Sequence, residues 1–419
     1  MQYHLEATRK YDPELYDLIC REQHRQEQTL ELIASESIQS PELLEINACA
    51  FNNKTAVGPI GEQELMGSEI AEELMKLTAE RACRAFGADH ANIQPYSGST
   101  ANFSVFAACL KAGDLILSMR PDQGSHPTHG ASNNIVSQLY QHAFYSIDRE
   151  KQTINYAELE RMANELHPKL IIAGGSAYSQ LIDFERIHHI AKSVGAYFMV
   201  DMAHQSGLIA AGVIPSPVPW ADFCSSSTTK TICGPRSGFV LCKAEHAEML
   251  DHGVHPGLIA SLHLQTMAAM AYTFLHATTP AFRETMQRTV DNAAALCEAL
   301  QRRGFNILSG GTKTHLMVAD MRGKGLAGQA FADALERVRI SVNAVPIAYD
   351  PSPIANGVRI GCTVTAQRGM AQAEMDQIAD IMARIAAAPE DVAVLETCAR
   401  EVTALTQRFP LYGRYDARP

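Results

Sequence analysis

Residues 196–212 have the sequence AYFMVDMAHQSGLIAAG, and residues 221–238 have the sequence ADFCSSSTTKTICGPRSG. The first stretch begins with a short apolar run, Ala196 to Val200, which is typical of a buried strand. In the second stretch, Phe223 to Ser226 predicts another short strand that leads into a turn rich in hydroxyl side chains. Each predicted strand is thus followed by a polar loop. We expect these two loops to carry the functional residues.

Asp201 ends the first of these strands, and Lys230 lies in the turn TTKT after the second. A pyridoxal phosphate site requires both features. The lysine forms a Schiff base with the cofactor, and the acid keeps the pyridine nitrogen protonated so that the ring accepts electrons. Taken singly, an aspartate at a strand end is more often a turn or cap residue, and such a lysine is usually just solvated. The flanking sequence decides between these interpretations.

The segments VDMAH, TTKT and GPRSG surround Asp201 and Lys230, and together they resemble the serine hydroxymethyltransferase family of pyridoxal phosphate enzymes. The resemblance implies an α/β protein of PLP-dependent transferase fold type I, the aspartate aminotransferase-like fold. A large doubly wound domain and a smaller C-terminal α+β domain are expected in it. We place an N-terminal arm at 1–45, the large domain at 46–280 and the small domain at 281–419. The resemblance also implies a homodimer with the active site at the subunit interface.

The composition narrows the class of partner. The 419 residues carry a net charge of -11, which argues against nucleic acid or an anionic membrane as the main partner. No apolar run is long enough to cross a bilayer, and the N-terminus lacks the apolar region of a signal peptide. The ten cysteines include no CxxC pair, so neither a disulfide framework nor a zinc site is predicted. The scattered cysteines fit buried thiols in a reducing cytoplasm. The family resemblance, rather than the composition, implies a small-molecule amino-acid substrate.

A candidate phosphate site lies in residues 88–102, ADHANIQPYSGSTAN. This segment predicts a short strand, a turn and a helix that begins near Thr100. Ser97, Gly98 and Ser99 would then place backbone N–H groups and hydroxyls at a helix N-terminus, which suits a phosphate group. Most turns of this kind only cap a helix. The presence of Lys230 in the same chain favours the cofactor phosphate.

The resemblance assigns cofactor contacts to residues in other loops. His126, in the segment SHPTHG, is implied to stack on the cofactor ring and to help position protons. His129 aligns with the family as well, but an HxxH pair without an acidic third ligand nearby predicts no metal site. Ser176 and His204 are implied to lie near the phenolic oxygen of the cofactor, and Ser227 belongs to the hydroxyl run before Lys230. The predicted catalytic residues are Lys230, Asp201, His126 and His204.

Substrate binding is implied for two residues outside these loops. Arg359, in GVRIG, matches the arginine that holds the substrate carboxylate in the family, for which a bidentate guanidinium is well suited. The alternative for Arg359 is a surface arginine on an edge strand. Ser35 matches the family segment LIASEN, in which this chain has Ser37 in place of the asparagine. For Ser35 the alternative is a serine that caps a helix.

The chain departs from the family on the substrate side. Thr55 replaces a tyrosine that reaches the cofactor phosphate of the neighbouring subunit, and Val57 replaces the glutamate that handles protons in hydroxymethyl transfer. Glu64 and Leu65 replace two tyrosines of the substrate pocket, and Val345 replaces the asparagine that holds the pterin. A valine cannot move a proton, and losing a general acid or base typically costs about 10²–10⁴-fold in rate. Folate-dependent interchange of serine and glycine is therefore disfavoured.

Three activities are compatible with a cofactor site that matches the family and substrate-binding positions that differ from it. The first is a folate-independent reaction on a modified amino acid such as an S-cysteine conjugate, by β-elimination or by decarboxylation with deamination. In this respect the chain resembles serine hydroxymethyltransferase-like enzymes of natural-product pathways. The second is an L-threonine aldolase or transaldolase, and the third is serine hydroxymethyltransferase activity with altered residues. A cofactor-binding subunit without turnover is the fourth, non-enzymatic alternative.

Overall fold

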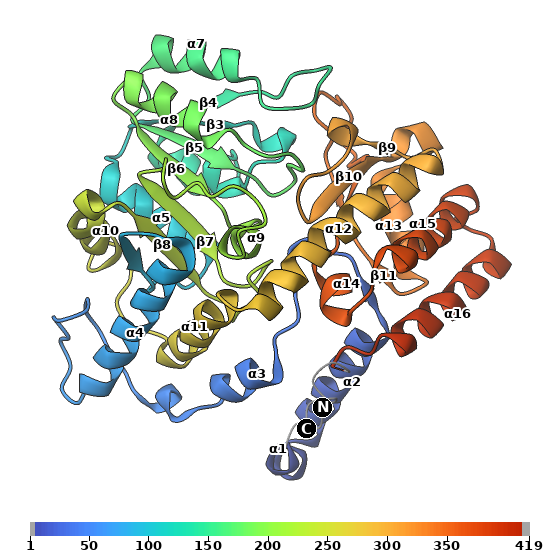
Figure 1. The fold of residues 1–419 in the computed structure, drawn as a ribbon, viewed down its shortest axis with the longest axis horizontal. Helices are drawn as coiled ribbons and strands as arrows, with labels where there is room; N and C mark the ends of the chain where they lie inside the picture. The colour runs from blue at the N-terminus through green and yellow to red at the C-terminus, as the bar shows by residue number, and fades with distance from the viewer. Residues whose placement is uncertain (1–4, 413–419) are drawn as a thin grey trace. The chain divides into compact units, whose positions relative to one another are not determined.

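A seven-stranded sheet forms the centre of the larger of two units in this computed structural model, which describes residues 5–412 (Figure 1). Its strand order is β2-β8-β7-β6-β5-β3-β4. The strands from β4 to β7 in this order are parallel to one another, whereas β8 pairs antiparallel with both β7 and β2. The bounds are β2 His90–Asn92, β3 Leu115–Met119, β4 Gln141–Tyr145, β5 Leu170–Gly174, β6 Tyr197–Asp201, β7 Phe223–Ser227 and β8 Gly238–Cys242.

The central strands β5 and β6 are largely apolar because both of their faces are covered, and β7 is buried as well although three of its five residues are serines. Every residue of β5 and of β7 is buried, and helix α8 packs on β5 and β6 while α5 packs on β7 and β8. Strands and helices alternate from β4 through α7, β5 and α8 to β6. The predicted doubly wound α/β fold is therefore confirmed.

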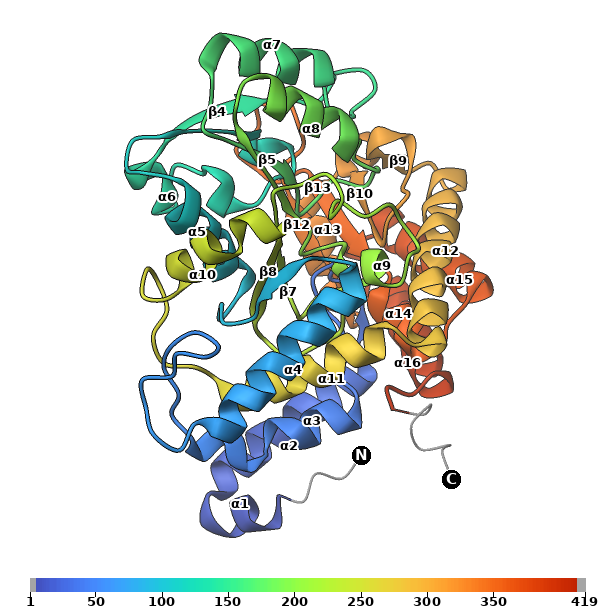
Figure 2. The ribbon, with the colours of Figure 1, turned by 60° about the vertical axis from the view of Figure 1, so that its left-hand side comes forward.

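The helix that the sequence predicts from near Thr100 is α5, which begins two residues earlier, at Gly98. The periodic segment Glu69–Phe86 is helix α4, and Gly87 ends it in the left-handed conformation with φ 68°. Helices α4 and α11 lie side by side in both ribbon views (Figure 2). The helix bounds are α3 Pro41–Asn47, α4 Glu69–Phe86, α5 Gly98–Cys109, α6 Val136–Leu139, α7 Tyr156–Leu166, α8 Phe184–Ser193, α9 Ser206–Ala210, α10 Ala247–Val254 and α11 Leu264–Ala277.

The smaller unit combines the chain up to Pro41 with Arg288–Pro346 and the residues from Pro351 onward. Its four-stranded antiparallel sheet has the order β12-β13-β10-β9, and β1 pairs parallel with β11. The strand bounds are β1 Leu30–Glu31, β9 Asn306–Ile307, β10 Leu316–Asp320, β11 Ile340–Ser341, β12 Asn343–Val345 and β13 Gly357–Gly361. The helix bounds are α1 Glu6–Tyr11, α2 Pro13–Gln28, α12 Pro280–Arg302, α13 Gly328–Glu336, α14 Thr363–Arg368, α15 Gln372–Ala387 and α16 Val392–Arg408.

A single apolar cluster forms the core of this smaller unit, and it includes Leu30 and Leu32 from the N-terminal part of the chain. The pairing of β1 with β11 places these residues there. Helix α12 runs across the position where the domain boundary is predicted, between residues 280 and 281. The domains at 1–45, 46–280 and 281–419 stay a prediction.

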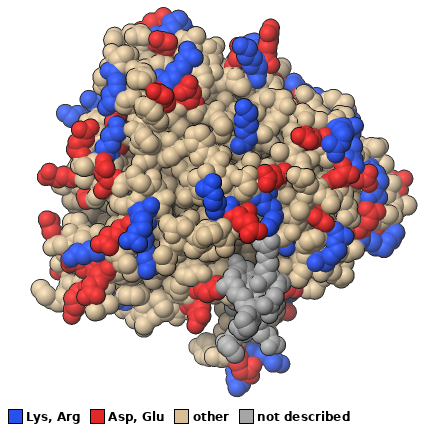
Figure 3. Space-filling view, in the orientation of Figure 1, with Lys and Arg blue, Asp and Glu red and all other residues tan. Residues whose placement is uncertain are grey.

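The surface is mixed in charge. Figure 3 shows acidic and basic side chains interspersed on the face in view, without a continuous basic stripe. Within residues 5–412, none of the helices combines the length and the apolar character that a membrane span requires. Over the whole sequence, acidic side chains outnumber basic ones and give a net charge of -11.

Candidate active site

Asp201 lies at the carboxyl end of β6, between the ends of β5 and β7. Its Oδ2 accepts hydrogen bonds from Asn102 Nδ2 at 2.9 Å and from His129 Nε2 at 3.0 Å. Its Oδ1 accepts from the backbone N–H of Ala203 at 3.0 Å. The side chain is only 10% exposed. The centre of the sheet edge therefore holds one carboxylate whose two oxygens are both hydrogen-bonded.

The surroundings keep this carboxylate ionised. Burial alone would raise the pKa of Asp201, but the hydrogen bond and charge of His129 outweigh it. The charge of Lys230 adds to this effect, so the pKa of Asp201 lies well below its ordinary value. An ionised carboxylate in a nearly buried site is the partner that a protonated pyridine nitrogen needs. The surroundings of Asp201 thus fit pyridoxal phosphate.

The two histidines of SHPTHG have different neighbours. His129 is buried and donates to Asp201, whereas His126 lies beside it, with the two ring centroids 5.8 Å apart. Nδ1 of His126 is 2.7 Å from the hydroxyl of Thr128. Burial lowers the pKa of His126 to about 4, so this ring is neutral at pH 7. The contact of His129 with Asp201 was not anticipated, and the stacking role of His126 stays a prediction.

Folding brings an acidic group to the HxxH pair. Ligand atoms of His126, His129 and Asp201 all lie within 4.8 Å of one another, so the premise that no acid is near these histidines is wrong. However, an ionised carboxylate can only accept a hydrogen bond, so Nε2 of His129 must carry a proton toward Asp201. A protonated nitrogen has no lone pair for a metal ion. This hydrogen bond and a metal ion thus compete for the same nitrogen.

The predicted phosphate site is the N-terminus of α5. Ser97 caps this helix: its hydroxyl accepts from the N–H of Thr100 at 3.1 Å, and its own N–H donates to the Thr100 hydroxyl at 2.7 Å. A Cβ atom on Gly98 would lie 3.2 Å from the Cβ of Ser227. The first turn of α5, which includes Ser99, therefore meets the end of β7. Backbone N–H groups at a helix N-terminus bind phosphate well, and the phosphate contacts stay predictions.

Lys230 lies next to this turn, and its Nζ donates to the hydroxyl of Ser227 at 3.2 Å. The next residue, Thr231, is fully buried and joins two loops. Its hydroxyl donates to the carbonyl of His204 at 2.9 Å and accepts from the N–H of Gly207 at 3.0 Å. The loop that carries Lys230 is thus held against the loop that carries His204. Both predicted residues lie at the same edge of the sheet as Asp201.

Ser176 lies just after β5 and is held by its backbone, because its N–H donates to the carbonyl of Gly124 at 2.7 Å. Gly174, at the end of β5, has φ 108°, and a Cβ atom there would lie 2.0 Å from the carbonyl oxygen of Asp201. Only glycine permits this close approach of β5 to the end of β6. The contact of Ser176 with the cofactor stays a prediction.

The predicted substrate residues lie together in the smaller unit. Arg359 of β13 pairs in register with Asn343 of β12, and its Nε donates to the Asn343 side chain at 3.1 Å. Burial lowers the pKa of Arg359 to about 10, so it remains charged at neutral pH. The turn that carries Ser35 contacts the end of this strand, since a Cβ atom on Gly361 would lie 2.4 Å from Cα of Ala34. The role of Ser35 and Arg359 in substrate binding stays a prediction.

A buried carboxyl group lies close to this turn. Burial, followed by the charge of Glu36, raises the pKa of Glu31 to about 8, from an ordinary value of 4.5. The backbone N–H of Ile33, which donates to Glu31 at 3.0 Å, only partly opposes this shift. Because the unfolded chain releases this proton at lower pH, the contribution of Glu31 to stability is complete below pH 4.5. It is lost as the pH rises toward 8.

We therefore predict that Glu31→Gln stabilises the protein increasingly between pH 5 and pH 8, by at most roughly 1.4 kcal/mol per pH unit. Urea unfolding at several pH values measures the difference in the free energy of unfolding between variant and wild type. Glu14→Gln, on the exposed surface of α2, is the matched control and should show no such trend. A constant difference across this pH range would contradict the prediction.

Four of the residues that depart from the family, Thr55, Val57, Glu64 and Leu65, lie in one loop of the larger unit, whereas Val345 lies on β12 of the smaller unit. Val57 forms an antiparallel bridge with Ser261. Oε1 of Glu64 is 3.0 Å from Nε2 of His255, so the carboxylate is held by a histidine of a second loop. The side chain of Glu64 is 58% exposed, and Leu65 is 39% exposed. A wider substrate pocket at these two positions stays a prediction.

Sequence reasoning missed Asn102, which joins four parts of the site. Its amide nitrogen donates to Asp201 and, at 2.8 Å, to the hydroxyl of Thr128, while its oxygen accepts from the hydroxyl of Ser225. The side chain is buried, with 1% of the residue exposed. A signal for it exists: Asn102 lies four residues after Gly98, and therefore on the same helix face as the phosphate turn. A buried asparagine is uncommon without such partners.

Comparison with known proteins agrees with this geometry. The model of the family described as serine hydroxymethyltransferase matches residues 8–382. A serine hydroxymethyltransferase of Thiobacillus denitrificans is 42% identical over 406 residues, which cover 96% of this chain and 98% of that protein. One of Methylobacillus flagellatus is 42% identical over 404 residues, covering 96% and 97%. This chain therefore belongs to the serine hydroxymethyltransferase family of pyridoxal phosphate-dependent enzymes.

Proposed function

We propose that this enzyme acts at Cα or Cβ of a modified amino acid without folate, by β-elimination or by decarboxylation with deamination. An S-cysteine conjugate of the kind made in natural-product pathways is the proposed substrate class. The observation that carries the proposal is Val57, an apolar residue at the position where the family resemblance implies a glutamate that handles protons. An isopropyl group neither donates nor accepts a proton.

The loop around Val57 offers no evident replacement for this glutamate. The N–H of Glu64 donates to the carbonyl of Val57 at 2.9 Å, which brings an acidic residue close to it in the backbone. The Glu64 carboxylate, however, is paired with His255. On the opposite side, the N–H of Leu262 donates to the carbonyl of Ala56 at 3.0 Å and anchors the loop. These contacts support a site that works without an acid at this position.

Arg359 is the residue that we assign to the substrate carboxylate. The hydrogen bond from its Nε to Asn343 orients the guanidinium plane, and an oriented guanidinium binds a carboxylate with two parallel hydrogen bonds. Ser35, on the turn that packs against the same strand, would add a hydroxyl donor. Val345 on β12 brings no amide to the site, which supports a substrate other than a folate.

Proton movement is assigned to Lys230. Pyridoxal phosphate, when bound, supplies an electron-withdrawing ring that stabilises negative charge at the substrate Cα. Lys230 is held beside Ser227 at the end of β7 and would take or return the proton at Cα. Asp201, kept ionised by its partners, would hold the ring nitrogen protonated. His126, neutral at pH 7, can accept a proton from a substrate hydroxyl or thiol.

Product analysis tests the proposal. The purified enzyme is incubated with S-substituted cysteines, with L-threonine, and with serine plus tetrahydrofolate. Pyruvate and ammonia from the cysteines would support β-elimination. An aldehyde with carbon dioxide and ammonia, formed with consumption of dioxygen as the two-electron oxidant, would support decarboxylation with deamination. Acetaldehyde from threonine would instead indicate an aldolase. Glycine formed only with folate would overturn the proposal.

Serine hydroxymethyltransferase activity is the second candidate function. The observation in its favour is the 42% identity to relatives of that name along 96% of this chain. Asn343, which orients Arg359, belongs to a stretch that otherwise matches the family. The incubation with serine plus tetrahydrofolate described above decides between the two candidate functions.

Restoring the acid tests the role of position 57. Val57→Glu is expected to change turnover of the proposed substrate by less than about twofold, whereas restoring a missing general acid or base gives roughly 10²-fold or more. Val57→Gln, with the same shape and no charge, is the control for steric effects. Steady-state kinetics with both variants measures the change. A large rise in kcat for Val57→Glu alone would show that the glutamate is needed after all.

We also infer that the enzyme works as a cytoplasmic homodimer. Three apolar side chains are exposed in one loop of the larger unit: Ile60 at 38%, Leu65 at 39% and Met66 at 92%. Exposed apolar groups that are close together favour contact with another protein surface. Sedimentation velocity at increasing protein concentration measures the oligomeric state, and a monomer at all concentrations would contradict the inference.

A further inference from the structure

The loop that connects β7 to β8 carries Lys230 within residues 228–235. Two backbone hydrogen bonds close this loop. The N–H of Gly234 donates to the carbonyl of Thr228 at 2.7 Å, and the N–H of Cys233 donates to the carbonyl of Lys230 at 3.0 Å. The course of the backbone on both sides of Lys230 therefore depends on how the chain turns at Cys233 and Gly234.

Cys233 has a backbone conformation that few side chains adopt. Its φ is 59°, in the left-handed region, where a Cβ atom crowds the following carbonyl oxygen and raises the free energy of the folded state. Glycine is the usual residue in this region because it has no Cβ atom. Among the non-glycine residues with positive φ in the described part of the chain, only Cys233 lies in a loop of the candidate active site. Strained residues of this kind concentrate at functional sites.

The side chain of Cys233 holds the residue that follows Lys230. Its thiol donates to the carbonyl of Thr231 at 3.2 Å, and Cys233 is 9% exposed. A Cβ atom on Gly207 would lie 2.2 Å from the same carbonyl oxygen, so this oxygen is also closely packed against a second loop. The hydroxyl of Thr231 is bonded to His204 and Gly207. A glycine at position 233 would relax the backbone but would lose the contact of the thiol.

We propose that Cys233 is a positioning residue for Lys230. Its left-handed conformation closes the loop, and its thiol fixes the carbonyl of Thr231, so that Nζ of Lys230 is held beside Ser227. The strain at Cys233 is offset by these contacts, and in return Lys230 has fewer orientations to lose when it captures the cofactor. The inference rests on the proposed role of Lys230 and is independent of which amino acid is the substrate.

Cys233→Gly separates backbone strain from function. Loss of the Cβ atom relieves the strain, so the apoprotein should unfold at a higher temperature than Cys233→Ala, by roughly 2 °C. At the same time, kcat with the amino acid that the wild-type enzyme converts should fall about tenfold or more below wild type, because a loop that moves misplaces Nζ. A residue that only supports the fold would not change thermal stability and kcat in opposite directions.

Capture of the cofactor provides a measurement without turnover. The apoprotein is titrated with pyridoxal phosphate, and the visible absorbance and the fraction of the Lys230 peptide that borohydride fixes are recorded. Cys233→Gly should bind the cofactor about threefold more weakly than wild type, or worse, because its loop is less preorganised. Cys233→Ser keeps the Cβ atom and a donor to the Thr231 carbonyl, so its affinity and kcat should lie within about twofold of wild type.

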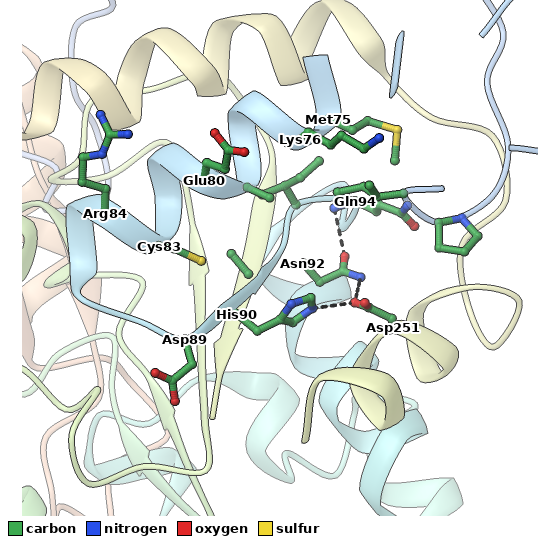
Figure 4. Close-up of a pocket in the computed structure, with 15 residues that line it drawn as sticks. Met75, Lys76, Glu80, Cys83, Arg84, Asp89, His90, Asn92, Gln94 and Asp251 are labelled. Carbon is green, nitrogen blue, oxygen red and sulfur yellow. Dashed lines mark hydrogen bonds and ion pairs between the residues drawn. The ribbon is translucent and has the colours of Figure 1, made fainter. Parts of the chain in front are cut away.

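Two control variants show whether the effects belong to this loop. His167→Gly relieves the left-handed residue that ends α7, with φ 45°, and should raise thermal stability without changing kcat or cofactor affinity. Cys83, on α4, lines a cavity of about 660 Å³ between α4, β2 and α10 (Figure 4), and none of the residues that line this cavity belongs to the candidate active site. Cys83→Ala should therefore leave kcat and cofactor affinity as in wild type.

The outcomes distinguish this inference from the proposed function. A Cys233→Gly enzyme with the kcat and the cofactor affinity of wild type would overturn the inference alone, and so would a Cys233→Ser enzyme that is no better than Cys233→Gly. A wild-type enzyme in which borohydride fixes no cofactor on Lys230 would overturn it together with the proposed function.

Discussion

Replacing Lys230 by alanine is expected to reduce kcat by about 10³-fold or more, since the variant loses both the covalent anchor of the cofactor and the general base. The physical reason lies in the position of Nζ, which is held 3.2 Å from the Ser227 hydroxyl at the end of β7. Lys243, which follows the antiparallel strand β8 of the same sheet, lies instead 3.7 Å from the carboxylate of Asp222. The visible absorbance of the holoenzyme should disappear together with the activity.

Borohydride reduction followed by peptide mass analysis provides a measurement that is independent of activity. In the wild-type enzyme the cofactor mass should be fixed on the peptide that contains Lys230, and in Lys230→Ala it should be fixed on no peptide. Lys111→Ala, at an exposed position before β3, should behave as the wild type in both assays. An adduct that persists in Lys230→Ala would place the cofactor elsewhere and would refute the proposed site.

Replacing Asp201 by asparagine is expected to lower kcat by roughly 10²–10³-fold, as for the loss of one preorganised electrostatic partner. Asparagine keeps the shape but removes the negative charge that would hold the ring nitrogen protonated. In one orientation the new amide nitrogen would face the donors Asn102 Nδ2 and His129 Nε2, and in the other it would face the N–H of Ala203, so at least one donor is left unpaired in both. Steady-state kinetics and cofactor titration of the apoprotein measure the two effects.

Asn102→Ala distinguishes the effect of the Asp201 charge on kcat from the effect of local packing around it. This variant removes one donor to Asp201 but leaves the carboxylate and the bond from His129 in place, so the fall in kcat should be at least about tenfold smaller than in Asp201→Asn. Thermal unfolding of both apoproteins shows whether either change acts through stability. An Asp201→Asn enzyme that binds its cofactor and turns over at the wild-type rate would exclude the role that we assign to the carboxylate.

The positions of Asp201 and Lys230 could be predicted because they depend on local order along the chain. Short apolar runs form buried strands, parallel strands end at the same edge of a sheet, and polar residues that follow them are therefore brought together. Ser97 and Gly98 were predictable for a similar reason, since a serine before a helix caps it. In these cases a pattern of a few neighbouring residues is enough to predict where the side chain lies.

The partners of Asp201 could not be chosen in this way. His126 and His129 are three residues apart in one segment, and the sequence does not tell which ring enters the sheet edge. The turn at Pro127–His129 buries His129 beside Asp201 and leaves His126 next to Thr128. Asn102 depends on the packing of α5 against β7, between segments about a hundred residues apart in the chain.

The sequence by itself determined the family, the doubly wound sheet and the strand ends at which Asp201 and Lys230 lie. These features depend on apolar periodicity and on short motifs. Only the tertiary structure decided which groups are buried together. Burial, followed by the charge of Glu36, raises the pKa of Glu31, and the carboxylate of Asp201 is held by Asn102 and His129 from two other segments. Burial and hydrogen-bond partners depend on contacts between distant segments, and no local pattern contains them.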